Sequence, residues 1–178
     1  MMNITEKIKN AIRDIKDFPK EGIVFKDITP ILLDPKLCEE IVDEFVKDIE
    51  PLNPDAIACV EARGFFFGTL IAQRLQIPFI PIRKKGKLPY DTISHSYDLE
   101  YGSATIEMHN DAIQPDWKVL IHDDLLATGG TASAAAELVV KKKAQVVGFS
   151  FLVDLTFLDG QKVLDPYCEK IISLIVNT

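Results

Sequence analysis

The residues best suited to chemistry in this sequence are two adjacent carboxylates and the small-residue turn that follows them. Asp123 and Asp124 close a short apolar run, which we expect to be a buried strand over 119–123. Two glycines follow in the turn, and apolar residues then recur at helical spacing over 132–140. A strand, a small-residue turn and a helix N-terminus present free N–H groups and a helix dipole to an anion. The stretch 119–131 is therefore predicted to bind a phosphate.

The acidic pair needs a purpose of its own, because carboxylates repel a nearby phosphate unless they hold something else. Sugar hydroxyls would fit, and so would a metal ion already coordinated by the ligand. The pattern therefore favours a ligand with a phosphate at one end and a polyol next to it. It is neither a Walker A loop, since no lysine precedes the threonine, nor a Rossmann Gly-x-Gly-x-x-Gly. The alternative is an ordinary strand–helix turn that happens to contain Gly-Gly.

Two basic features follow predicted strands, although the 178-residue chain has a net charge of −7. Arg63 follows a predicted strand over 56–60, and four of the seven residues of 83–89 are cationic. Parallel sheets bind ligands at the carboxyl ends of their strands, so we expect Arg63 and 119–131 to share a crevice. Arg63 would offer a fork of donors to a pyrophosphate. The alternatives are a surface arginine that caps a helix and a solvated charge run.

The elements that must position these residues alternate between strand and helix after about residue 54, which is typical of an α/β fold with a mostly parallel sheet. The predicted strand over 79–82 contains Pro81, which favours a position at the edge of the sheet or in a bulge. The alternating stretch 97–108 predicts an antiparallel hairpin. The chain predicts a helix over 64–75 and strands over 56–60, 79–82, 119–123, 144–153 and 171–176.

Two further helices are predicted nearer the N-terminus, with a short extended segment over 23–30 between them. The first helix spans about 4–15, where Asn3 and Glu6 can form a capping pair. The second begins after Asp34 as N-cap, with a proline in the first helical position.

Composition indicates one domain with a sizeable core, because 47% of residues are hydrophobic and 26% are charged. The acidic balance argues against a general nucleic-acid or membrane surface. No apolar run approaches the length of a membrane span, and the N-terminus lacks an apolar signal core, so we expect a cytoplasmic protein. The three cysteines fit no disulfide or zinc spacing and are expected to be buried free thiols.

Taken in order, these pieces resemble the adenine phosphoribosyltransferases, a family of type I phosphoribosyltransferases. The resemblance covers about 17–164 and is carried by 17–19, 22–28, 61–65, 83–89, 97–102 and 119–131. It implies a central mostly parallel twisted sheet flanked by helices. It also implies a small N-terminal hood over about 1–33, a core over about 34–178 and a mobile β-hairpin lid at about 84–109, all in a single domain over 1–178.

The same resemblance implies a purine salvage reaction that converts adenine and 5-phosphoribosyl-1-pyrophosphate (PRPP) to AMP and pyrophosphate. Mg²⁺ would be held mainly by ligand oxygens and water rather than by a protein cage, and the protein would be a homodimer. Asp123 and Asp124 would bind ribose hydroxyls, 127–131 the 5′-phosphate, and cationic side chains the pyrophosphate. The implied PRPP- and AMP-binding residues are Arg63, Arg83, Lys87, Tyr101, Asp123, Asp124, Leu125, Leu126, Ala127, Thr128, Gly129, Gly130 and Thr131.

For the base, the resemblance implies contacts from Val24, Phe25 and Lys26, with Phe25 stacking on one side of adenine and Leu155 packing on the other. Glu100, on the lid, would be the catalytic residue. If it were protonated, it could hydrogen-bond N7 and help N9 to lose its proton, which requires a raised pKa. The resemblance also implies a cis peptide bond between Glu61 and Ala62.

Two positions depart from the family pattern. His122 replaces an aliphatic residue beside the acidic pair, and we expect it to be a core or interface histidine rather than a catalytic one. Lys26 stands where arginine is common, and only a main-chain contact there would survive this exchange.

Other functions remain open on the sequence alone. A phosphoribosyltransferase for hypoxanthine, xanthine or guanine is the nearest, but such enzymes typically carry an acidic residue at the position of Ala127. A PRPP-binding regulator without catalysis usually adds a nucleic-acid-binding domain, for which neither the length before Asp17 nor the net charge is suitable. A purely structural α/β protein would leave 119–131 unexplained.

Overall fold

The computed structural model describes residues 2–98 and 102–177 and divides into two compact units, 1–44 and 45–178. We call them the N-terminal unit and the C-terminal unit. Helix α2 (Pro35–Ile49) begins in the first and ends in the second. Within the described ranges, no helix is long and apolar enough to cross a membrane.

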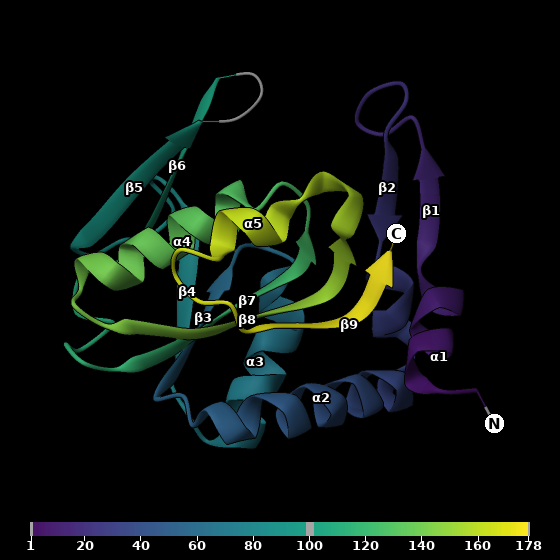
Figure 1. Ribbon diagram of the computed structural model, residues 1–178, viewed down its shortest axis with the longest axis horizontal. Helices are drawn as coiled ribbons and strands as arrows, with labels where there is room; N and C mark the ends of the chain where they lie inside the picture. Colours follow the sequence, from purple (N-terminus) through teal and green to yellow (C-terminus); the bar gives the residue numbers. More distant parts are fainter. Residues whose placement is uncertain (1, 99–101, 178) are drawn as a thin grey trace. The chain divides into compact units, whose positions relative to one another are not determined.

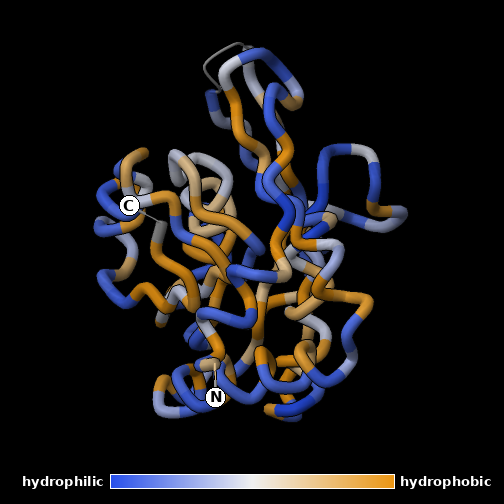
Figure 2. The backbone as a smooth tube through the Cα atoms, turned by 90° about the vertical axis from the view of Figure 1, so that its right-hand side faces the viewer, coloured by the Kyte–Doolittle hydropathy of each residue, from blue (hydrophilic) through white to orange (hydrophobic). Residues whose placement is uncertain are grey.

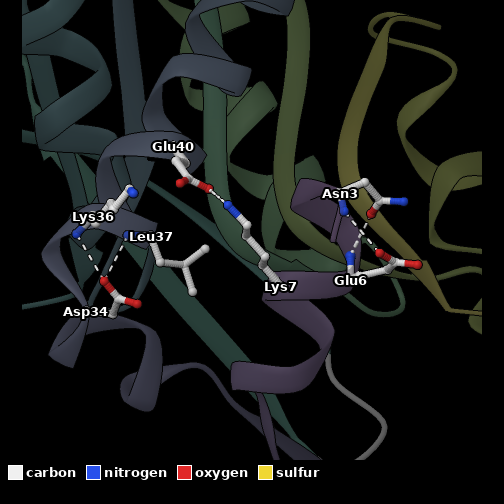
Figure 3. Close-up of polar contacts among 7 residues, drawn as sticks. All are labelled: Asn3, Glu6, Lys7, Asp34, Lys36, Leu37 and Glu40. Atoms are coloured by element: carbon white, nitrogen blue, oxygen red, sulfur yellow. Dashed lines mark hydrogen bonds and ion pairs between the residues drawn. The ribbon is translucent and has the colours of Figure 1, made fainter. Parts of the chain in front are cut away.

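The N-terminal unit begins with helix α1 (Ile4–Ala11), whose capping box between Asn3 and Glu6 confirms the predicted pair. Asp34 accepts from the first backbone N–H groups of α2, as predicted, and Lys7 of α1 forms an ion pair with Glu40 of α2 (Figure 3). A short 3₁₀ helix, η1 (Thr29–Leu33), precedes α2.

The prediction of a first helix reaching residue 15 is wrong. Ile12 already has extended backbone angles, and the chain continues as strand β1 (Arg13–Lys16). This strand pairs antiparallel with β2 (Val24–Asp27), with Ile15 opposite Phe25. Pairing with the next strand therefore overrides the helical spacing of the isoleucines, and the predicted extended segment over 23–30 is confirmed only for β2.

The C-terminal unit is built on a seven-stranded sheet in the order β5-β6-β4-β3-β7-β8-β9 (Figure 1). Five strands are parallel: β3 (Ala56–Val60), β4 (Phe79–Lys84), β7 (Lys118–Leu126), β8 (Gln145–Leu155) and β9 (Ile171–Asn177). β5 (Thr92–Asp98) and β6 (Ser103–His109) form the predicted antiparallel hairpin. Its strands change between orange and blue along their length in Figure 2, as expected of half-buried strands.

Two strand predictions need correction. β7 does not end at Asp123 but runs to Leu126, because its pairing with β8 continues as far as Asp154. β4 is not an edge strand, since it lies between β3 and β6. The antiparallel register of β6 reaches only Arg83 and Lys84, so Pro81 lies beyond it, and its missing N–H is tolerated inside the sheet.

Helices cover both faces of this sheet (Figure 1). Helix α4 (Gly130–Lys141) packs its alanines against alternate residues of β3 and β7, including Ala58 and Ile121. The intervening residues Cys59 and His122 lie instead toward Gly68 of helix α3 (Gly64–Leu75). A short 3₁₀ helix, η3 (Thr156–Leu158), and helix α5 (Gly160–Leu164) follow β8, and another 3₁₀ turn, η2 (Glu50–Leu52), precedes β3. Of the three cysteines, which are all free, Cys59 is buried and the others are half-buried.

Candidate functional site

The turn after β7 has the geometry of an anion site. Gly129 precedes α4 with a φ of 82°, a left-handed conformation that favours glycine. Because glycine has no side chain to cap the helix, the first N–H groups of α4 are available to a ligand, and the helix dipole favours negative charge there. A cavity follows the turn and is lined by Arg63 and residues 123–132. We call it the loop cavity.

A second cavity lies at the carboxyl ends of β3 and β4, where an open parallel sheet binds its ligands. We call it the strand-end cavity. It shares Arg63, Asp123, Asp124 and Thr131 with the loop cavity, so the predicted crevice is present. Among the described residues its lining is Val60, Glu61, Arg63, Ile82, Arg83, Lys84, Tyr97, Ala104, Ile106, Asp123, Asp124 and Thr131.

The two carboxylates of the acidic pair lie close together, with Asp124 buried and Asp123 half-buried where it lines both cavities. Asp124 is 3% exposed, and its backbone N–H donates to Asp123 Oδ1 at 2.8 Å. Burial raises the pKa of Asp123 well above its usual range, and the neighbouring Asp124 charge adds to that rise. Burial also raises the pKa of Asp124, while Arg63, whose Nε lies 3.0 Å from Asp124 Oδ2, opposes the rise. Hydroxyl donors or a cation would stabilise the ionised pair.

The basic cluster supplies cations to the lining of the strand-end cavity. Arg83 donates from Nε to Glu61 Oε2 at 2.5 Å and from Nη1 to the Lys87 carbonyl at 3.1 Å. Arg83 and Lys84 line the cavity, whereas Lys87 is exposed and does not. The predicted departure of this cluster as a loop is confirmed from Lys85 onward, because β4 includes Lys84.

Glu107 supports the basic loop beside this site, a role that the sequence did not reveal. It is 4% exposed on β6, and its Oε1 accepts from the backbone N–H groups of Gly86, Lys87 and Leu88 at 2.9, 3.2 and 3.2 Å. The carboxylate therefore shapes the basic loop from inside. One acidic residue in an alternating strand gave no signal of this role, because its three donors are distant in the chain.

Tyr97 was also not predicted as a site residue, although it lies in one of the segments that carried the resemblance. It is half-buried on β5 and lines the strand-end cavity. Its hydroxyl lies 3.1 Å from Thr131 Oγ1. The other lining residues from the hairpin, Ala104 and Ile106, are small or apolar and gave no chemical signal.

Two predictions near the site are confirmed. The Glu61–Ala62 peptide bond is cis. His122 is a core residue, fully buried, with Nδ1 2.8 Å from Ser150 Oγ and its ring edge-on to Phe45 at 5.2 Å between centroids. Burial lowers the pKa of His122 to about 3, so the ring is neutral at physiological pH.

The predicted base contacts are divided between the two units. Val24, Phe25 and Lys26 lie on β2 of the N-terminal unit, and Leu155 ends β8 of the C-terminal unit. Phe25 makes an edge-on contact with Phe18, and Lys26 Nζ donates to Asp14 Oδ1 at 2.8 Å. The adenine site therefore stays a prediction. Glu100 and Tyr101 lie outside the described residues.

Comparison with known proteins agrees with this arrangement. A model of the phosphoribosyl transferase domain matches residues 28–175. The adenine phosphoribosyltransferase of Cytophaga hutchinsonii is 57% identical over 172 residues, which cover 97% of this chain and 95% of that protein.

Solved structures give the same result. The adenine phosphoribosyltransferase of Thermoanaerobacter pseudethanolicus matches with a TM-score of 0.93 at 51% identity, covering 97% of this chain and 99% of that one. The Saccharomyces cerevisiae enzyme, complexed with an imino-altritol bisphosphate and adenine, matches with a TM-score of 0.90 at 36% identity, covering 96% and 98%. With its strand-end acidic pair, its glycine turn and these relatives, the chain belongs to the phosphoribosyltransferase family, among the adenine phosphoribosyltransferases.

Proposed function

We propose that this enzyme transfers the phosphoribosyl group of PRPP to adenine and so forms AMP and pyrophosphate in purine salvage. The observation that carries the proposal is the convergence of a phosphate-binding turn, a buried acidic pair and Arg63 on two adjoining cavities. PRPP has a matching order of groups: a 5′-phosphate, ribose hydroxyls and a pyrophosphate. The S. cerevisiae relative was solved with adenine and a bisphosphate, which supports the same pair of ligands here.

Each part of PRPP has a partner of suitable chemistry in this arrangement. The N–H groups and hydroxyls of 127–131 would hold the 5′-phosphate. Asp123 and Asp124 would accept hydrogen bonds from the ribose hydroxyls, which stabilises the ionised form of a buried pair. Leu125 and Leu126 continue β7 between these two groups and set their spacing. Arg63, Arg83 and Lys87 would contact the pyrophosphate.

The main contribution of the protein to the reaction is then electrostatic stabilisation of the transition state. The bond between C1′ and the pyrophosphate oxygen breaks, positive charge develops on the ribosyl ring, and negative charge grows on the departing pyrophosphate. Cationic side chains at the strand-end cavity neutralise that growing charge. Adenine N9 forms the new bond to C1′ and loses its proton. We assign the proton exchange at N7 and N9 to Glu100, with Tyr101 beside it at the PRPP site.

The described residues fit Mg²⁺ held through the ligand. No three His, Cys, Asp or Glu side chains among them converge as a metal site. Mg²⁺ prefers oxygen ligands, retains several waters and is commonly held through substrate phosphates. Asp123, Asp124 and Glu61 are the carboxylates that line the strand-end cavity, where they could meet the waters of such an ion. When bound, the ion would neutralise pyrophosphate charge.

We further propose that Val24, Phe25 and Lys26 meet the adenine together with Leu155, and that Lys26 acts through its main chain. The engagement of its ammonium by Asp14 supports a main-chain role. The 1–33 hood, the 34–178 core with its 84–109 lid, the homodimer and the cytoplasmic location belong to the same proposal. Ala127 lacks the carboxylate typical of hypoxanthine–guanine enzymes at this position, and Glu100 offers an acid from the lid instead, which favours adenine.

A base-specificity assay tests this function. The enzyme is mixed with PRPP, Mg²⁺ and either adenine, hypoxanthine, xanthine or guanine, and both nucleotide and pyrophosphate are measured. We expect AMP and pyrophosphate in equal amounts from adenine and no comparable product from the other bases. A preference for another purine would correct the substrate, and PRPP binding without pyrophosphate release would indicate a regulator.

A further inference from the structure

Tyr97 is the one polar lining residue from the hairpin strands, within the described residues, that the proposed function does not use. Its ring lies beside the start of α4, since a Cβ atom on Gly130 would be 3.7 Å from Tyr97 Cδ2. The same strand is tied to the far end of α4, where Lys141 Nζ donates to the Ser94 carbonyl at 2.9 Å. The place of the ring is thus fixed by contacts that do not involve its hydroxyl.

The partner of that hydroxyl is Thr131, the second residue of α4. The two oxygens are 3.1 Å apart, so one hydroxyl donates to the other. Thr131 lines both cavities and is therefore where the phosphate turn meets the strand-end cavity. Either direction of donation is possible in the free enzyme, because each hydroxyl can donate once and also accept.

A phosphate removes that freedom. Phosphate oxygens accept hydrogen bonds, so the Thr131 hydroxyl can bind a phosphate only by donating its single proton to it. Thr131 then has lone pairs, but no proton, to offer Tyr97, and the phenol must donate. The result is a chain of two hydrogen bonds from Tyr97 through Thr131 to the phosphate, in which each bond polarises the next.

We propose that Tyr97 is a positioning residue that directs the Thr131 proton toward the 5′-phosphate of PRPP. The inference rests on the proposed function, in which 127–131 hold that phosphate. It assigns Tyr97 to phosphate binding, and it predicts a loss confined to ligands that carry a 5′-phosphate.

The Tyr97→Phe variant isolates the hydroxyl, because the ring and its packing remain. Binding is measured for two probes: ribose 5-phosphate, which has the 5′-phosphate, and inorganic pyrophosphate, which does not. We expect ribose 5-phosphate to bind about threefold to tenfold more weakly and the KM for PRPP to rise equally, as for loss of one neutral hydrogen bond. Pyrophosphate affinity and the KM for adenine should stay unchanged. Tyr90→Phe, at a tyrosine that is 69% exposed, is the matched control.

A double-mutant cycle with Thr131→Val separates this role from a structural one. If Tyr97 acts through Thr131, adding Tyr97→Phe to Thr131→Val causes no further loss of ribose 5-phosphate affinity. Losses that multiply, or a Tyr97→Phe variant that binds ribose 5-phosphate normally, would overturn the proposal. Failure of the wild-type enzyme to form AMP would instead overturn the proposed function, so the two results are distinct.

Discussion

A Cβ atom on Gly160 would lie 2.2 Å from the carbonyl oxygen of Ala127, and one on Gly129 would lie 2.6 Å from the Gly160 carbonyl oxygen. The start of α5 therefore touches the 127–131 turn backbone to backbone. Gln161 is bound to the buried Asp154 of β8, which keeps this helix in place. The 127–131 turn is therefore supported by α5, for which no ligand contact is predicted.

The first prediction concerns Gly160→Ala. The new Cβ atom would clash with the backbone carbonyl oxygen of Ala127, which cannot rotate away as a flexible side chain could. The turn must therefore shift, and we expect the KM for PRPP to rise at least about tenfold. Overpacking should also lower the free energy of unfolding by about 1–3 kcal/mol. Steady-state kinetics and urea unfolding measure the two effects. Lys162→Ala, on the exposed side of the same helix, is the control, and an equal change there would contradict the explanation.

The acidic pair gives a second prediction, on stability. Because the pKa values of both carboxyl groups are raised, the folded protein still holds protons on this pair at a pH above 3.8, the ordinary pKa of aspartate. It then binds more protons than the unfolded chain, so its free energy of unfolding should fall as pH rises from about 4 to the raised values. Asp123→Asn removes a carboxyl group whose raised pKa causes this decrease, so it should stabilise the ligand-free protein by about 1 kcal/mol at neutral pH. Turnover should fall at least about a hundredfold.

Thermal unfolding of the wild type and Asp123→Asn across pH 4–9 measures this difference, and the exposed Asp111→Asn serves as control. The gap between the two unfolding midpoints should widen as pH rises. A gap that narrows would show that the pair is stabilised, rather than strained, in the free enzyme.

A third prediction concerns Glu107 and the basic loop. Glu107→Ala leaves three backbone N–H groups without their acceptor, so the amides of Gly86, Lys87 and Leu88 should lose protection in hydrogen exchange. Stability should fall by about 1–3 kcal/mol, and pyrophosphate should bind more weakly. Glu107→Gln keeps an acceptor oxygen and should restore most of the protection. Unchanged exchange in Glu107→Ala would show that the loop holds its shape without the carboxylate.

His122 provides a fourth prediction, which can be read by NMR. With a pKa of about 3, its ring nitrogens should show constant chemical shifts between pH 8 and pH 5. An unfolded chain takes up a proton on this residue near pH 6.5, so its contribution to stability is present above that value and is lost as pH falls toward 3. A His122 that titrates near pH 6.5 in the folded protein would contradict the buried, neutral assignment.

The part of the fold that follows local patterns was predictable. Strand β3 and helix α3 have the predicted bounds, and for β3 the reason is that a fully buried strand reads as a continuous apolar run. Ile12 and Ile15 misled the first helix prediction, since their spacing suits a helix while β2, further along the chain, supplies a strand partner. Local sequence carries no record of that pairing.

Some residues in and around the site were likewise predictable from the sequence, and others were not. Arg63, Asp123 and Asp124 were predicted to meet because the ends of parallel strands converge at one edge of a sheet. Glu107 and Gly160 were not, because their roles depend on backbone atoms of loops that fold over them. Glu107 follows an ordinary alternating pattern, and Gly160 is one glycine among several. Only the packed structure shows which carbonyl or N–H lies opposite.

The acidic pair should also couple ligand binding to the release of protons. If ribose binds there as proposed, its hydroxyl groups favour the ionised carboxylates, so occupation of the site should lower the raised pKa values of Asp123 and Asp124 and release protons to the solvent. Sugar phosphate and hydrogen ions are thus competitors for one pair of side chains. The heat of binding should depend on the ionisation enthalpy of the buffer, and the affinity should increase as the solution becomes more alkaline.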